Sequence, residues 1–278
     1  MSVANFIPKL WSARLLANLD KKLVFGSVVN RDYEGEIQRF GDSVVINQMG
    51  NVTIKDYTGA DIDTPEDVTS ATQTLLIDQA KYFNFKVKDI DQAQANVALV
   101  DKAMARAAYA IADEIDQAIA GLVDGAGKTI GTLLAPISIT KDNAYDKLVD
   151  LGVELDNVNI DRVGRKVVLP PWYIGLLSKD PRFTTNFKVL ENGVVDGASV
   201  AGFTIHMSNN ILKDTTDPTI FRVPAMTSQA ISYAGQVAET EPYRPESNFS
   251  DAVKGLYVYG HKVVEPSALV QFIVKQGA

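Results

Sequence analysis

A long run of helical periodicity constrains the fold of this chain more than any other feature of its sequence. Between Ile90 and Leu122, glycine and proline are absent until Gly121. Apolar side chains recur there every three or four residues, at Ile90, Ala93, Val97, Val100, Met104, Ala107, Ile111, Ile115, Ala118 and Leu122. Such a helix is about 50 Å long at 1.5 Å per residue, roughly three times the usual length. We expect a rod with a narrow apolar strip, either a coiled-coil seam or a helix lying across a sheet or hairpin.

The residues before this helix have the pattern of β-strands. Polar and apolar side chains alternate from Tyr82 to Lys88, which predicts a strand with one buried and one wet face. Runs typical of strands lie at 43–47, 51–57, 72–78 and 81–89. A polar, acidic loop at 57–70 separates the strand pairs. Residues 33–88 therefore predict a long β-hairpin with a small core of its own.

The second half of the chain mixes short helices and strands. Residues 142–155 predict a helix with Asp142 as its N-cap, and 171–183 predict another that closes before Pro181. Strands are expected at 165–171, 199–208, 219–225, 230–235, 255–266 and 267–276. We find no internal repeat and no linker that separates independent domains. The pattern as a whole predicts an α+β fold.

The first 30 residues combine large apolar side chains with basic ones. Trp11, Leu15 and Leu19 recur every four residues, which is the spacing of one helix face. Two interpretations remain open for this segment. It is either the first core helix or an arm that packs on a neighbouring subunit.

Composition excludes several classes of function. The net charge is −7 and the sequence pI is about 4.9, so the chain lacks the basic balance of proteins that grip nucleic acid. It has no cysteine, which excludes disulfides, cysteine-based zinc sites and thiol nucleophiles. No apolar run is long enough to span a membrane, and the N-terminus lacks the features of a secretion signal. We expect neither membrane association nor sequence-specific DNA binding.

The two histidines are the obvious candidates for chemistry. His261 alternates with Tyr257 and Tyr259 in a predicted strand, and no serine, aspartate or cysteine flanks it at a catalytic spacing. His206 is likewise a strand residue without a visible partner in sequence. We interpret both as structural residues.

Metal and phosphate motifs are also weak. The loop 61–67 clusters four carboxylates, but Pro65 occupies a ligand position of an EF-hand and the required glycine and glutamate are missing. The segment 125–131 contains GKT, yet it follows a helix and position 122 is leucine where a Walker A motif requires glycine. No motif indicates a cofactor, so an enzyme is not the expected class. A metal-dependent enzyme or binding protein that uses loop 61–67 remains an alternative.

The order of these elements resembles the major capsid (coat) protein of tailed bacteriophages, whose shell fold is shared with herpesvirus capsids and encapsulins. NFIPKLWSARLLANLDK is similar to the N-terminal arm of that family. VVLPPWYIGLLSKDPRF is similar to the strand and helix that open its axial domain. GLYVYGHKVVEPSALVQFIV is similar to the closing strands of its peripheral domain. The resemblance covers nearly the whole chain.

The resemblance implies a domain organisation. It places an N-terminal arm at 1–30 and an extended β-hairpin loop at 31–88. It assigns 89–157 and 236–278 to a peripheral domain, with a spine helix at 89–123. It assigns 158–235 to an axial domain. On this division His261 is a strand residue of the peripheral domain.

The resemblance also implies function and partners. We expect a non-enzymatic protein that self-assembles, as hexamers and pentamers, into an icosahedral head enclosing double-stranded DNA. Assembly would take place in the bacterial host cytoplasm, with separate scaffolding, portal and head-completion proteins. An encapsulin-type compartment shell is the alternative within this fold. The candidate residues for contacts between subunits are Phe6, Trp11, Arg14, Asp61, Asp63, Glu66 and Asp67.

Overall fold

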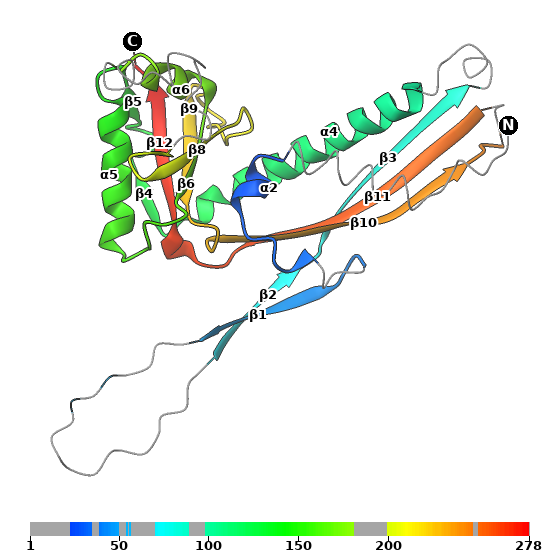
Figure 1. The fold of residues 1–278 in the computed structure, drawn as a ribbon, viewed down its shortest axis with the longest axis horizontal. Helices are drawn as coiled ribbons and strands as arrows, with labels where there is room; N and C mark the ends of the chain where they lie inside the picture. The colour runs from blue at the N-terminus through cyan, green and yellow to red at the C-terminus, as the bar shows by residue number, and fades with distance from the viewer. Residues whose placement is uncertain are drawn as a thin grey trace.

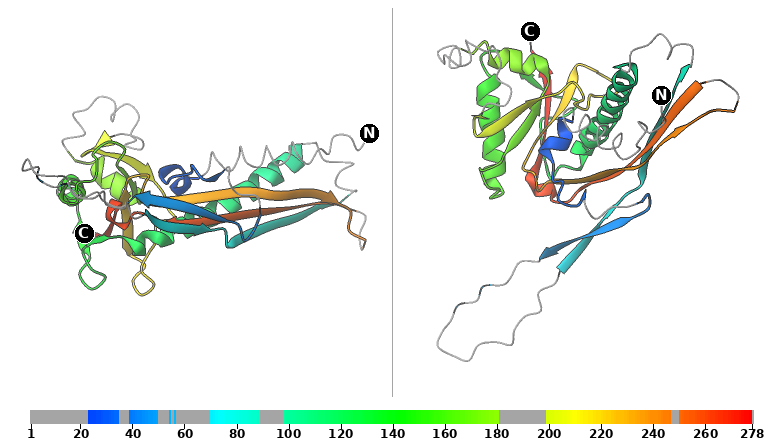
Figure 2. Two further views of the ribbon diagram at one scale, coloured as in Figure 1. Left: turned by 90° about the horizontal axis from the view of Figure 1, so that it is seen from below. Right: turned by 45° about the vertical axis from the view of Figure 1, so that its right-hand side comes forward.

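The computed structural model describes residues 23–34, 39–49, 54, 56, 70–88, 98–180, 199–246 and 250–277. Two sheets organise this part of the chain (Figure 1). A seven-stranded sheet with two helices forms one body, and a long three-stranded sheet with one helix extends from it. A separate two-stranded ribbon projects away from both, as the right-hand view in Figure 2 also shows.

The three-stranded sheet carries the long helix on one face. It consists of β10 (Ile231–Tyr243), β11 (Ser250–Val263) and β3 (Gln79–Lys88), all antiparallel, with β11 in the centre. Helix α4 (Ala98–Gly121) packs Met104 and Ala108 against Phe83, Phe85 and Val253. The helix thus lies across a sheet, one of the two arrangements that its periodicity predicted.

The expected apolar strip of α4 is buried or partly buried in its described part. Met104, Ile111 and Ile115 are at most 5% exposed. The helix ends at Gly121, where the 3-10 turn η3 (Leu122–Gly125) follows, so it stops short of the expected end at 123. Residues 89–97, where the sequence predicts its start, lie outside the described residues.

The seven-stranded sheet is mixed and forms the larger core. Its order is β4-β12-β9-β6-β8-β7, and β5 also pairs with β12. Its strands are β4 (Lys128–Ile130), β5 (Ile137–Ile139), β6 (Lys166–Leu169), β7 (Ser199–Val200), β8 (Phe203–Met207), β9 (Ile220–Met226) and β12 (Leu269–Gln276). Helices α5 (Ala144–Asn157) and α6 (Pro171–Leu177) pack on this sheet, and η4 (Pro266–Ala268) precedes β12.

The ribbon and a short helix complete the fold. Strands β1 (Ser43–Met49) and β2 (Ser70–Leu76) pair antiparallel along their whole length. The four-residue helix α2 (Phe25–Val28) lies between α4 and the seven-stranded sheet (Figures 1 and 2). Among the described residues, no helix combines the length and the hydropathy that crossing a bilayer requires.

The domain division that the resemblance implies stays a prediction, and strand pairing joins residues that it assigns to different parts. Residues 79–88, which it places in the hairpin loop, form β3, and this strand pairs with β11. Residues 128–157 and 264–278, which it places with the spine helix, contain β4, β5 and β12 of the seven-stranded sheet. These strands join partners far away in the sequence, which the local pattern does not encode.

Several element boundaries also differ from expectation. Asn143 occupies the N-cap position of α5 in place of Asp142, and its side-chain oxygen accepts a hydrogen bond from the Thr140 amide. Helix α6 ends at Leu177, well before Pro181. The expected strand at 51–57 has only Ile54 and Asp56 among the described residues, and neither belongs to a strand.

Candidate functional site

The expected interface residues lie outside the part of the chain that the structure describes. This holds for the three in the N-terminal segment and for the four acidic residues of the ribbon loop: Phe6, Trp11, Arg14, Asp61, Asp63, Glu66 and Asp67. Their role in contacts between subunits stays a prediction. The described elements that lead into both segments are the root of the β1–β2 ribbon and the residues around α2.

The root of the ribbon packs on the three-stranded sheet, on the face opposite α4. Leu75 and Ile77 are fully buried and share a core with Ala234 and Val258. A side chain at Gly260 would collide with the carbonyl oxygen of residue 76, so glycine allows the two backbones to come close. This packing fixes the direction in which the ribbon leaves the molecule.

Polar contacts reinforce the root of the ribbon. The Lys262 ammonium donates to the Thr74 carbonyl at 3.0 Å, and the Gln73 amide donates to the Val264 carbonyl at 3.1 Å. On the outward face, Val45 and Leu76 remain 55% and 50% exposed. The ribbon therefore presents apolar side chains that its own chain does not cover.

The outer face of the three-stranded sheet is polar with aromatic side chains. Tyr82 is 79% exposed, and the Asn84 amide donates to the Tyr243 hydroxyl at 2.8 Å. Lys254 pairs with Glu241 at 2.9 Å, and this ion pair raises the pKa of Lys254 and lowers that of Glu241. A shallow hollow of about 310 Å³ lies among these side chains. This surface combines an exposed tyrosine, a tyrosine–asparagine hydrogen bond and an ion pair.

A buried carboxylate lies at the junction of α4, α2 and the larger sheet. One oxygen of Asp116 accepts from the Val24 amide at 2.8 Å, and the other accepts from the amides of Phe25 at 3.0 Å and Gly26 at 3.3 Å. The side chain is 2% exposed, and burial raises the pKa of Asp116 to about 6 against the lowering effect of the three N–H donors. The neighbouring carboxylate of Asp113 adds to the increase.

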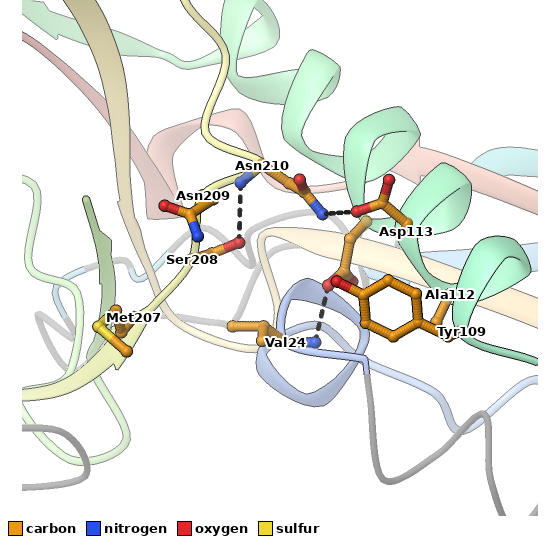
Figure 3. A pocket seen from close by; sticks show the side chains of 9 residues that line it. Val24, Tyr109, Ala112, Asp113, Met207, Ser208, Asn209 and Asn210 are labelled. Carbon is orange, nitrogen blue, oxygen red and sulfur yellow. Dashed lines mark hydrogen bonds between the residues drawn. The ribbon is translucent and has the colours of Figure 1, made fainter. Parts of the chain in front are cut away.

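A polar hollow of about 230 Å³ adjoins this carboxylate (Figure 3). Asn210 donates to Asp113 at 2.7 Å, which links the chain after β8 to α4. The Ser208 hydroxyl accepts a hydrogen bond from the backbone N–H of Asn210 at 3.1 Å. Tyr109 and Met207 line the hollow from opposite elements. The hydrogen bond between Asn210 and Asp113 crosses the hollow, which therefore lies at a junction between elements.

The histidines take structural positions. His261 lies on β11 beside Tyr259, with ring centroids 5.9 Å apart, and burial lowers its pKa. His206 lies on β8, as expected. Within the described residues, no three histidine, cysteine, aspartate or glutamate side chains group closely enough to hold a metal ion.

Sequence reasoning missed the charged residues that fix the junction. Asp116 interrupts the apolar face formed by Ala112, Ile115 and Ile119, and an acid in such a stripe is the signal that marks it. Arg165 directly precedes the buried strand β6, and Lys166 is the first residue of that strand. Arg165 is 4% exposed and donates to the carbonyls of residues 152, 160 and 161, so it links the last part of α5 to the loop that follows.

Comparison with known proteins shows the family to which this chain belongs. The model of the family described as phage capsid protein matches residues 70–272. This chain belongs to the phage capsid protein family. A structure from Mycobacterium phage Che8 is 30% identical, with a TM-score of 0.72 and coverage of 90% of each chain. No curated protein sequence matches the chain.

More distant structures share the fold of this phage capsid protein. The capsid of Ralstonia phage GP4 is 12% identical, with a TM-score of 0.66 over 90% of this chain and 88% of that chain. A virus-like particle from Pyrococcus furiosus is 13% identical, with a TM-score of 0.58 over 95% of this chain and 98% of that chain. The α+β shell fold expected from the sequence is confirmed. The protein is a structural component of an icosahedral phage capsid.

Proposed function

We propose that the β1–β2 ribbon and residues 1–22 are the elements that bind neighbouring copies in the shell. The observation that carries this proposal is the ribbon itself. Its root is fixed by Leu75, Ile77 and the close approach at Gly260, while Val45 and Leu76 stay exposed on the outward face of the same segment. An isolated two-stranded ribbon is marginally stable in water, so a partner surface would stabilise it.

The finer features of assembly belong to the same proposal. The copies form hexamers and pentamers, because a closed shell repeats a few interfaces with related symmetry. Many modest contacts then act together. The shell encloses DNA without reading its sequence, in keeping with the net charge of −7. Assembly takes place in the bacterial host cytoplasm with separate scaffolding, portal and head-completion proteins, and the protein has no catalytic role.

We also propose a domain division that follows strand pairing. The peripheral domain consists of α4 with β3, β10 and β11, and the axial domain consists of the seven-stranded sheet with α5 and α6. The extended loop is then limited to the β1–β2 ribbon and the residues between its strands. This division keeps each hydrogen-bonded sheet within one domain.

Deletion of the ribbon tip tests the proposal. Replacing residues 60–69 with a short glycine-serine turn should leave a folded subunit that no longer forms regular particles. Removing residues 1–22 should have the same effect. A matched control replaces residues 215–218, a turn of the larger sheet, and should still assemble. Each variant is expressed with its genomic neighbours and analysed by light scattering, circular dichroism and negative-stain microscopy. Normal particles from either deletion would show that the deleted segment is not needed for assembly.

A further inference from the structure

Residues 23–30, here called the strap, lie against both bodies of the protein. Phe25 and Val28 are fully buried in the main core, which also contains Ile115 of α4 and Val167 of β6. A helix of four residues has little stability of its own, so its conformation depends on these contacts. The strap therefore occupies the angle between α4 and the seven-stranded sheet (Figures 1 and 2).

Two opposite charges from different bodies hold the two ends of the strap. At its start, the Asp116 carboxylate on α4 accepts from the amides of Val24, Phe25 and Gly26. At its end, the Lys166 ammonium on β6 donates to the carbonyls of residues 27 and 28, both at 3.1 Å. Each charge satisfies backbone groups that a four-residue helix cannot pair internally. Burial lowers the pKa of Lys166, so the chain pays a desolvation penalty to keep this contact.

A third anchor ties the strap to the three-stranded sheet. The backbone N–H of Asn30 donates to the Ile231 carbonyl, and the backbone N–H of Tyr233 donates to the backbone carbonyl of Asn30, both at 2.9 Å. Asn30 thereby forms an isolated parallel bridge with Ser232 at the start of β10. This point lies directly after β9, where the chain passes from the larger sheet to the smaller one.

We propose that the strap is a conformational lock that holds the seven-stranded sheet at one angle to α4 and the three-stranded sheet, with Asp116 and Lys166 as its charged anchors. The chain also crosses between the two bodies through η3, through residues 227–230 and through residues 264–268. The strap adds a non-covalent tie to these connections. Residues 1–22 precede it directly, so a pull on that segment acts first on the lock.

A distance measurement across the two bodies tests the lock. The chain has no cysteine, so Tyr82→Cys with Leu134→Cys places two nitroxide labels at defined surface sites, one on β3 and one beyond β4. Both native side chains are exposed, at 79% and 100%. In the unassembled full chain, electron paramagnetic resonance should give one narrow distance distribution. Adding Lys166→Met should broaden or shift this distribution, and so should Asp116→Ala in a separate variant.

The controls use an exposed ion pair within α5. Lys147 pairs with Asp150 at 2.8 Å, away from the strap. Lys147→Met is therefore the control for Lys166→Met, and Asp150→Ala is the control for Asp116→Ala. Both controls should keep the narrow distribution. A Lys166→Met protein with the parental distribution would overturn the proposal, even if Asp116→Ala failed to fold.

Hydrogen exchange provides a second readout that a merely local role would not change. Lys166 bonds only to the end of the strap. If its role were local, Lys166→Met would loosen that end alone, and the amides of Val24, Phe25 and Gly26 would stay protected from hydrogen exchange. A lock predicts that Lys166→Met speeds exchange of these amides and of the Tyr233 amide by about tenfold, the effect of losing one net hydrogen bond. Unchanged exchange at both places would show independent contacts and would refute the lock.

Discussion

Replacing Asp116 with asparagine separates two opposing effects on a buried carboxyl group. Its three backbone N–H donors favour the ionised form, whereas its burial favours the neutral form. Burial dominates, and the pKa rises from 3.8 to about 6. Asparagine has nearly the same shape and does not ionise. The variant therefore removes the dependence of stability on this one proton.

The magnitude follows from linkage between protonation and folding. Each pKa unit corresponds to 1.36 kcal/mol, so a rise from 3.8 to about 6 corresponds to about 3 kcal/mol. Because the folded state has the higher pKa, it binds the proton more tightly than the unfolded state. The stabilisation is complete below pH 3.8 and is lost as the pH rises through about 6.

Denaturant unfolding of the unassembled subunit between pH 4 and 8 measures this effect. The free energy of unfolding of the parent minus that of Asp116→Asn should fall by about 2 kcal/mol across this range, because at pH 4 the unfolded state is already partly deprotonated. His261 has a lowered pKa and acts in the opposite direction, losing stability as the pH falls below 6.5. It is present in both proteins, so its contribution cancels in the difference.

Two results would refute this reasoning. A difference that stays constant with pH would mean that the pKa of Asp116 is not raised in the folded protein. A difference that grows with pH would mean that the three N–H donors outweigh burial and lower the pKa. In both cases the junction would tolerate the charge better than its burial implies.

Three further substitutions test packing and charge. Ile111→Asp places an unpaired charge in the core under α4 and should prevent folding, whereas Ile111→Val should cost about 1 kcal/mol in denaturant unfolding. Gly260→Val should force the ribbon root from the sheet and abolish regular particles seen by microscopy, with circular dichroism little changed; Gly121→Ala, which meets no neighbour, serves as its control. Arg165→Ala should lower the free energy of unfolding by about 3 kcal/mol, because it leaves the oxygen atoms that Arg165 pairs at the end of α5 without a donor. Arg165→Lys should recover less than half of this loss. Full recovery by lysine would contradict a role for the planar guanidinium.

The sequence predicted those elements whose signal is local. Alternation between Tyr82 and Lys86 appears in β3 as exposed and partly buried side chains in turn. The burial of Met104, Ile111 and Ile115 on α4 and the strand position of His261 are also confirmed. The spacing of apolar residues within one segment shows which of its side chains are buried, so these elements can be predicted from that segment alone.

Features that depend on distant partners were not predictable. Strand β10 was expected at 230–235 but continues to Tyr243, through Glu239, Glu241 and Pro242. These residues argue against a central strand, yet an outer strand tolerates them. The partner of β3 lies on β11, far away along the chain. Asp116 could be noticed as an acid in an apolar stripe, but its acceptance of three amide protons depends on residues 24–26.

The order of strands in the smaller sheet has a consequence for copies that have not yet joined a shell. Strands β10 and β3 form its two outer edges, and an outer edge is a template for unwanted backbone pairing between molecules. On β10, Pro242 has no N–H to donate to another molecule. Asn30 already pairs with the same strand at Ser232, so this part of its edge is covered. Lys86 places a repelling charge on the exposed side of β3. Identical subunits at high concentration thus avoid merging into a continuous sheet, which would compete with ordered closure.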